Sequence, residues 1–265
     1  PDFDHSSWAS NQQSSYVEYT GRFGPNPNYQ KGELPFAVFG DGGRFNLDAN
    51  GTPEVVDTFD LRFSLSVPRN CTMPSNGYPI VLYAHGTGGG WKSYLSYART
   101  LGEQCIAMMG VDQIFHGERP GAPDSITQTQ LLFFNFQNVE AGRTNGRQSA
   151  IDEVQRARLF TEQQATIPAS ASHTGEEIRF DPSQVMFFGH SQGGLNGPLY
   201  LAAADSSVGG VLSGSSSVLS ITLLEKTEPS PSVAGAVRLL LGLTGSDADE
   251  YDIFHPGIML AQSLV

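Results

Sequence analysis

Apolar residues in this chain fall into runs and alternating stretches of strand length, separated by helical patterns. From Thr58 to Val67 apolar and polar positions alternate, which is typical of a strand with one exposed face, commonly antiparallel. Four other segments are short and almost continuously apolar, which predicts buried strands. They cover residues 79–85, 105–111, 185–188 and 208–213.

Helical patterns lie between and after these strands, over residues 91–103, 148–165, 195–204, 233–243 and 257–264. Strands that alternate with helices favour an α/β fold with a mostly parallel central sheet flanked by helices. Residues 1–35 are polar, carry several prolines and show neither pattern, so we expect an irregular arm there.

The length of 265 residues leaves room for one large domain or two small ones with a sizeable core. We divide the chain into an N-terminal arm with the first strands over 1–54, an α/β core over 55–214, and a cap or helical segment over 215–265. The net charge of −12 argues against nucleic-acid binding, since phosphate backbones would be repelled. No apolar run has the length of a membrane span.

Cysteine usage bears on the compartment. Cys71 and Cys105 each lie just before a predicted strand, so a disulfide is favoured if those strands are parallel neighbours. Two unpaired buried thiols are the alternative. We expect a secreted or periplasmic protein, because the chain has few lysines and one possible cystine. The sequence starts at Pro1 and not at Met, which fits a signal peptide that has been removed, or an N-terminal segment that was not included.

The candidate nucleophile is Ser191, in the pentapeptide Gly189-His190-Ser191-Gln192-Gly193. A buried strand is predicted before it and a helix after it, which is the context that a nucleophile elbow requires. Glycines two positions to either side let strand and helix approach closely at a strained turn. The alternative is a glycine-rich turn with an incidental serine.

A nucleophilic serine also needs donors for the oxyanion that forms during acyl transfer. The backbone N–H of Gln192 is the first candidate, because it directly follows the serine. The loop His85-Gly86-Thr87-Gly88-Gly89-Gly90 follows a predicted strand, and we expect the Thr87 amide to be the second donor, with Gly88 as second choice. The same loop could cradle a phosphate, but it lacks the Lys-Ser/Thr of a P-loop.

Three motifs in this order resemble the α/β-hydrolase family, in its bacterial secreted lipase/esterase-like branch. They are His85-Gly-Thr-Gly-Gly, Asp112-x-x-x-His116-Gly117 and Gly189-His-Ser-Gln-Gly193, and the resemblance covers residues 55–215. It implies a serine hydrolase that cleaves carboxylic esters through an acyl-enzyme. The substrate expected is a small-molecule or lipid ester, and no cofactor or metal is expected.

The chain departs from the family in its catalytic base. The family order is Ser, then Asp or Glu, then His, and His255 is the one histidine after Ser191. No strand-like run precedes it, and His255-Pro256 resembles the start of a helix. We therefore expect a fold that lacks its last strand-helix units, with a second polypeptide, such as the rest of a cleaved precursor, supplying acid and histidine. His255 as base, and a truncated inactive chain, are the alternatives.

Two other functions compete with an esterase. One is a non-catalytic binding protein that keeps the hydrolase fold, which the intact serine motif opposes and the missing histidine favours. The other is a hydrolase of amides, thioesters or polyesters, since the same triad serves all of these reactions.

Overall fold

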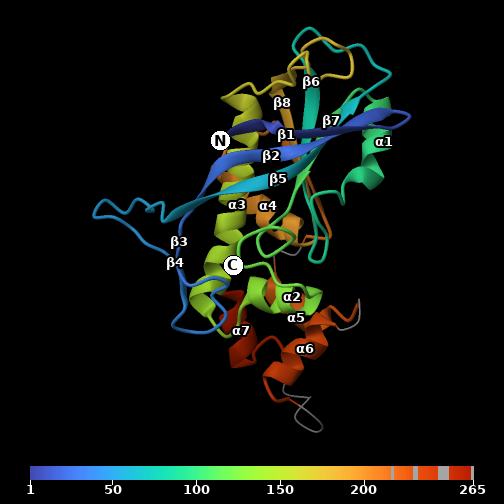
Figure 1. Cartoon of the computed structure of the whole chain (residues 1–265). Coiled ribbons are helices and arrows are strands. Elements are labelled where there is room, and N and C mark those ends of the chain that lie inside the picture. The colour runs from blue at the N-terminus through green and yellow to red at the C-terminus, as the bar shows by residue number, and fades with distance from the viewer. Residues whose placement is uncertain (216–217, 229–231, 244–250, 264–265) are drawn as a thin grey trace.

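The computed structural model describes residues 1–215, 218–228, 232–243 and 251–263. The strands of its large sheet are Asp2–Gln12 (β1), Tyr16–Asn28 (β2), Asp57–Pro68 (β5), Tyr78–Ala84 (β6), Ala107–Val111 (β7), Phe180–His190 (β8) and Gly209–Ser213 (β9). Within the described residues their order is β1-β2-β5-β7-β6-β8-β9 (Figure 1). Gln30–Gly32 (β3) and Gly42–Phe45 (β4) form a separate two-stranded sheet.

The half of the sheet from β7 to β9 is parallel, as the continuous apolar runs predict. β6 pairs with β7 and with β8, and β8 pairs with β9, each in the parallel sense. The register places Ala84 beside Gly189, and Gly189 beside Leu212. The carboxyl ends of β6, β8 and β9 therefore meet at one edge, which is where ligands bind in open α/β sheets.

The other half of the sheet is antiparallel and includes the segment expected to be an irregular arm. That expectation is wrong, because β1 pairs with β2 and β2 pairs with β5. Val17, Tyr19 and Phe23 of β2 are buried in the main core. β1 lies at the sheet edge, where its backbone pairs with β2. Most of its side chains are exposed and polar, so the sequence shows no alternating apolar pattern there.

Helices cover both faces of the sheet (Figure 1). They are Leu95–Glu103 (α1), Ile126–Phe134 (α2), Val139–Thr161 (α3), Gln192–Ala203 (α4), Leu219–Glu225 (α5), Val233–Leu240 (α6) and Pro256–Gln262 (α7). α3 and α4 pack against β8 on one face, whereas α1 packs against β5 and β7 on the other. α2 and α5 to α7 gather beyond the end of the sheet where the chain reaches Ser191.

α3 begins at Val139, well before the helix predicted over 148–165. Its first turns bury polar residues, which hides the apolar periodicity of a helix. Gln30 donates to Oγ1 of Thr144 at 2.9 Å and to Oδ1 of Asn145 at 2.8 Å. These buried groups are satisfied by residues distant in sequence, as buried polar groups must be.

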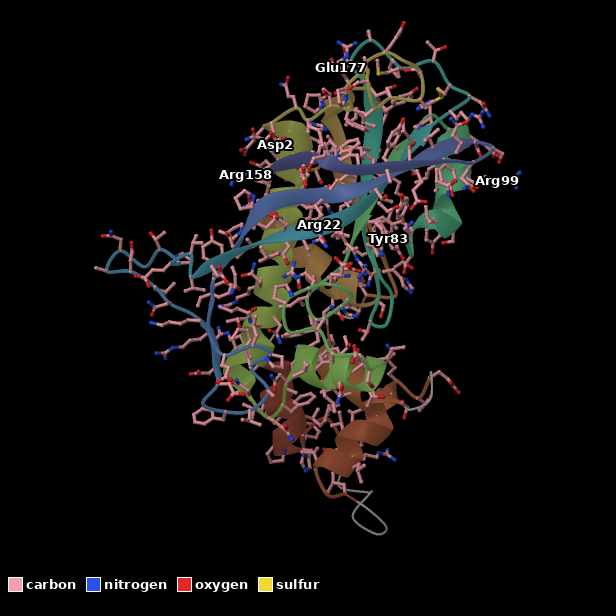
Figure 2. All side chains as sticks on the ribbon, viewed as in Figure 1. Asp2, Arg22, Tyr83, Arg99, Arg158 and Glu177 are labelled. Carbon is pink, nitrogen blue, oxygen red and sulfur yellow. A yellow bond between two sulfur atoms is a disulfide. The ribbon has the colours of Figure 1, made fainter. Side chains whose placement is uncertain are left out.

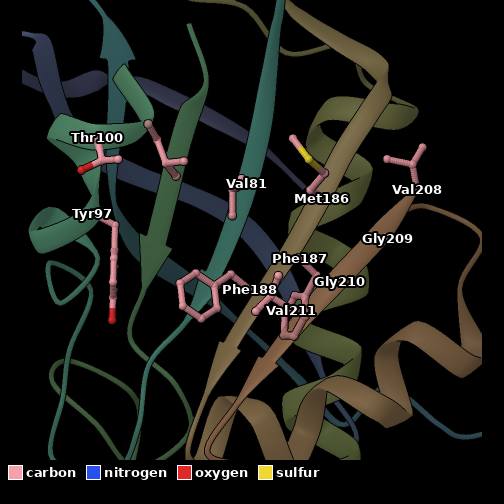
Figure 3. Close-up of a pocket in the computed structure, with 11 residues that line it drawn as sticks. Val81, Tyr97, Thr100, Met186, Phe187, Phe188, Val208, Gly209, Gly210 and Val211 are labelled. Atoms are coloured by element: carbon pink, nitrogen blue, oxygen red, sulfur yellow. The ribbon is translucent and has the colours of Figure 1, made fainter. Parts of the chain in front are cut away.

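β9 was expected to be buried, and instead it is an exposed edge strand. Val211 is 59 % exposed, and no described strand pairs with its outer side. Beside it, a largely apolar cavity of about 450 Å³ opens on the α1 face of the sheet (Figure 3). Val81, Met186 and Phe188 line this cavity. The edge and the cavity together leave this corner of the sheet uncovered among the described residues.

The predicted disulfide is present. Cys71 and Cys105 are bonded, with their Cα atoms 5.7 Å apart. Cys71 precedes β6 and Cys105 precedes β7, and these strands are parallel neighbours as the argument required. Among the described residues no helix has both the length and the apolar character needed to cross a bilayer.

Candidate active site

Ser191 occupies a strained turn between β8 and α4. Its backbone has φ 51° and ψ −111°, an unusual conformation for a residue with a side chain. The Ser191 N–H donates to the carbonyl of Ser213 at 2.9 Å, which ties the turn to the end of β9. The serine side chain lines an open cavity of about 430 Å³.

The glycines of the elbow have a steric cause. A Cβ atom at Gly189 would overlap the carbonyl of Gly193, and one at Gly193 would overlap the carbonyl of Ala84. At Gly86, a Cβ atom would lie 2.9 Å from the Cβ atom of Ser191. Strand, helix and the loop after β6 therefore approach one another only because these three positions lack side chains.

Near Ser191, the backbone amides of Thr87 and Gln192, like that of Gly86, have no hydrogen-bond partner among the described residues. The Thr87 hydroxyl donates to Oε1 of Gln192 at 2.8 Å, which holds the two residues together. The Gly88 N–H, in contrast, donates to Nε2 of His116 at 2.9 Å. The Gly88 amide is therefore occupied, whereas the amides of Thr87 and Gln192 are available to an oxyanion.

His116 is locked in one tautomer by this arrangement. Since its Nε2 accepts from Gly88, its Nδ1 carries the proton and donates to the carbonyl of Ile114 at 2.9 Å. Burial lowers the pKa of His116 below its usual range, so the neutral acceptor form persists. His116 thus fixes the orientation of the loop that carries Thr87.

His85 supports the same loop from beneath. Its Nε2 accepts from the N–H of Gln113 at 3.0 Å, and its Nδ1 donates to the carbonyl of Gly86 at 2.8 Å. Burial, and then the neighbouring His116, lower the pKa of His85 from 6.5 to about 3. His85 is therefore neutral at physiological pH and acts as a structural hydrogen-bonding group.

A side-chain relay missed by sequence reasoning joins this loop to α4. The side-chain Nε2 of Gln113 donates to the backbone carbonyl of His85. Nδ2 of Asn196 donates to Oε1 of Gln113 at 3.0 Å. A carbonyl can only accept, so the relay fixes which atom of each amide is the donor. Oδ1 of Asn196 and Nε2 of Gln192 are left buried and unpartnered within the described residues.

Among the described residues, no histidine is hydrogen-bonded to the hydroxyl of Ser191. None of them is therefore placed to act as its base. His255 caps α7, where its Nδ1 accepts from the N–H of Gly257 at 3.2 Å, and it does not line the Ser191 cavity. The ring of His190 contacts Ser213 at 3.4 Å. The helix start predicted at His255-Pro256 is confirmed.

The Ser191 cavity is bounded on its far side by the C-terminal helices. Leu219 and Glu225 of α5, Lys226, and Val233 of α6 line it. Periodicity predicted α6, but nothing in the sequence placed α5 against the serine. Among the residues that the structure describes, no three histidine, cysteine or acidic side chains gather as a metal site would need.

Comparisons with known proteins find no matching family model and no matching curated protein. Solved structures similar to this chain include an acetyl xylan esterase from Paenibacillus sp. R4, 12 % identical, with a TM-score of 0.47 over 97 % of this chain and 66 % of that chain. The peroxisomal alpha-beta-hydrolase Lpx1 from Saccharomyces cerevisiae is 14 % identical, with a TM-score of 0.44 over 95 % and 67 %.

A cold-adapted esterase from an Arctic intertidal metagenomic library is 15 % identical, with a TM-score of 0.43 over 77 % of this chain; the chain spans 64 % of that esterase.

In the chain itself, a parallel sheet half ends in a strained serine turn that leads directly into a helix. The loop after β6 meets that serine. This chain therefore has an α/β-hydrolase fold.

Proposed function

We propose that this chain is a serine hydrolase that cleaves carboxylic esters, with Ser191 as the nucleophile. One observation carries the proposal: Ser191 is held at φ 51° beside two backbone amides that have no partner among the described residues. Such strain persists only where the surrounding structure imposes it, and it is concentrated at functional sites. A non-catalytic binding protein would have no need of a strained serine beside amides that lack a partner among the described residues.

In the proposed mechanism, Oγ of Ser191 attacks the ester carbonyl carbon and its proton passes to a base. The amides of Thr87 and Gln192 donate to the oxyanion of the tetrahedral intermediate. The intermediate collapses, the alcohol leaves with the proton from the base, and an acyl-enzyme remains. Water then attacks the acyl-enzyme by the same route in reverse and releases the acid.

The base in this proposal is a histidine that a second polypeptide brings to the carboxyl end of β9, together with an acidic partner. The exposed outer side of β9 can accept a further strand, and unpaired strand edges favour such pairing. The apolar cavity over Val81, Met186 and Phe188 can receive an apolar helix (Figure 3). His255 is the alternative base within the chain.

An activity-based probe tests the proposal. A fluorophosphonate should label the complete protein at Ser191, identified by mass spectrometry, and Ser191→Ala should abolish labelling. Ser215→Ala, in the same cavity, is the matched control and should leave labelling intact. A complete, folded protein that never reacts at Ser191 would favour the binding-protein alternative. His255→Ala should also leave labelling intact, and its loss would identify His255 as the base.

Substrate class is addressed by a panel of p-nitrophenyl esters of increasing acyl length, with matched amides, thioesters and polyesters. The proposal predicts the fastest turnover for esters. The disulfide is consistent with action outside the reducing cytosol, so we propose a secreted or periplasmic enzyme.

A further inference from the structure

A second cavity adjoins the one that contains Ser191. Its volume is about 380 Å³, which lies within the range of small-molecule sites. Both cavities share part of their walls: Phe134, Leu195, Ser215 and Leu219. The two cavities are therefore adjacent across these side chains.

Gly146 of α3 lines the second cavity where α3 approaches α4. A Cβ atom at Gly146 would lie 3.4 Å from Oδ1 of Asn196 and 3.9 Å from Leu199, so a larger side chain there would project into the space. Leu199, Pro198 and Leu212 make the adjacent walls apolar. These walls suit a hydrocarbon chain.

Two arginines on α3, Arg143 and Arg147, line this cavity one helical turn apart. Every other arginine of the chain has a hydrogen bond, an ion pair or a ring contact. Arg143 and Arg147 have none among the described residues. Both arginines are exposed, so their guanidinium groups lie at the solvent-facing side of the cavity, with no acidic partner among the described residues.

We propose that this cavity binds the distal carboxylate of the substrate. The claim rests on the proposed function and names its substrate class: monoesters of linear dicarboxylic acids, in which an apolar chain joins the scissile carbonyl to a terminal carboxylate. Guanidinium groups match a carboxylate in a planar, bidentate geometry. Asn196 offers only a free acceptor, Oδ1, so the anion is held by the arginines.

Equilibrium binding to the full chain carrying Ser191→Ala tests the proposal without turnover. The ligands are monomethyl suberate and dimethyl suberate, which differ by one methyl group and one charge, followed by NMR titration. The monoester should bind about fivefold more tightly, because solvent weakens charge-assisted hydrogen bonds to two exposed arginines. Adipate and sebacate monoesters then define the chain length. Equal affinity for the charged and neutral ligands would refute the proposal.

Arg143→Gln with Arg147→Gln should bring the two affinities to within about twofold of each other. Arg158→Gln, near the other end of the helix (Figure 2), is the control, because it removes the same charge from α3 at a position that does not line the cavity. An equal loss in the control would reduce the effect to net charge and overturn the proposal. Gly146→Leu should weaken binding of both ligands by filling the cavity; unchanged binding would place the ligand elsewhere.

The two hypotheses fail separately. Carboxylate-selective binding without fluorophosphonate labelling would support the carboxylate site and refute the proposed hydrolase activity. Labelling at Ser191 with no preference for the charged ligand would keep the hydrolase and exclude this substrate class.

Discussion

Acidification should destabilise the fold through His85. Folding lowers the pKa of His85 from 6.5 to about 3, chiefly because the ring is buried. A depressed folded-state pKa means that the unfolded chain binds the proton first as pH falls. The stability from His85 is thus complete above pH 6.5 and is lost as pH falls toward 3. Linkage across this interval gives a loss of about 3 kcal/mol between pH 7 and pH 4.

Urea unfolding at pH 7, 6, 5 and 4 measures this loss when the wild type is compared with His85→Gln. Glutamine can accept from the N–H of Gln113 and does not titrate. Asp152 and Glu153, whose pKa values are raised by burial, act in the opposite direction and contribute equally to both proteins. The variant should be less stable at pH 7, and the difference should shrink by about 3 kcal/mol at pH 4.

Parallel stability curves for the two proteins would refute the reasoning, since they would show that His85 does not couple folding to protonation. If His85→Gln fails to fold, the ring signals of His85 in the folded wild type provide the same test. They should stay unshifted down to about pH 4, and a transition near the ordinary histidine value would contradict burial as the cause.

Other predictions concern the disulfide, the turn around Ser191 and the loop that carries Thr87. Replacing Cys71 and Cys105 together by serine opens a disulfide with a sequence separation of 34, and urea unfolding should show a loss of about 4 kcal/mol; an unchanged midpoint would contradict this. Gly193→Ala should cost about 1–3 kcal/mol or more in thermal unfolding through overlap with the strand backbone, whereas Gly209→Ala, with open space around its Cβ atom, should be tolerated. For the proposed hydrolase, His116→Ala should lower kcat about tenfold or more at similar KM, less than loss of an oxyanion donor itself; an unchanged kcat would show that the loop keeps its conformation without His116.

Elements whose stability is local could be predicted from the sequence. The buried strands β6, β7 and β8 are read from continuous apolar runs, and the elbow from glycines that leave no room for side chains. β2 was missed because Pro25 and Pro27 and its polar residues conceal the apolar face of Val17, Tyr19 and Phe23. The start of α3 was missed because its buried face is polar, and only partners such as Gln30 satisfy it.

The choice between Thr87 and Gly88 as oxyanion donor illustrates the same division. The sequence prediction preferred Thr87 to Gly88, although both amides lie in the same glycine-rich loop at a strand end. His116, 28 positions from Gly88, separates them by accepting the Gly88 N–H and leaving that of Thr87 unpartnered among the described residues. His116 stays neutral because the folded chain buries it and lowers its pKa. Which amide of the loop lacks a partner therefore depends on tertiary packing and not on the local sequence.

The distal cavity follows this pattern too. Arg143 and Arg147 are spaced like ordinary surface arginines on a helix, and no local signal distinguishes them from Arg158. The proposed role depends on the cavity that α4 and α5 form beside Gly146, where neither guanidinium group has an acidic partner among the described residues. Short-range sterics thus determine the position of Ser191, while long-range packing determines which groups lie around it and forms the cavity proposed to bind the distal carboxylate.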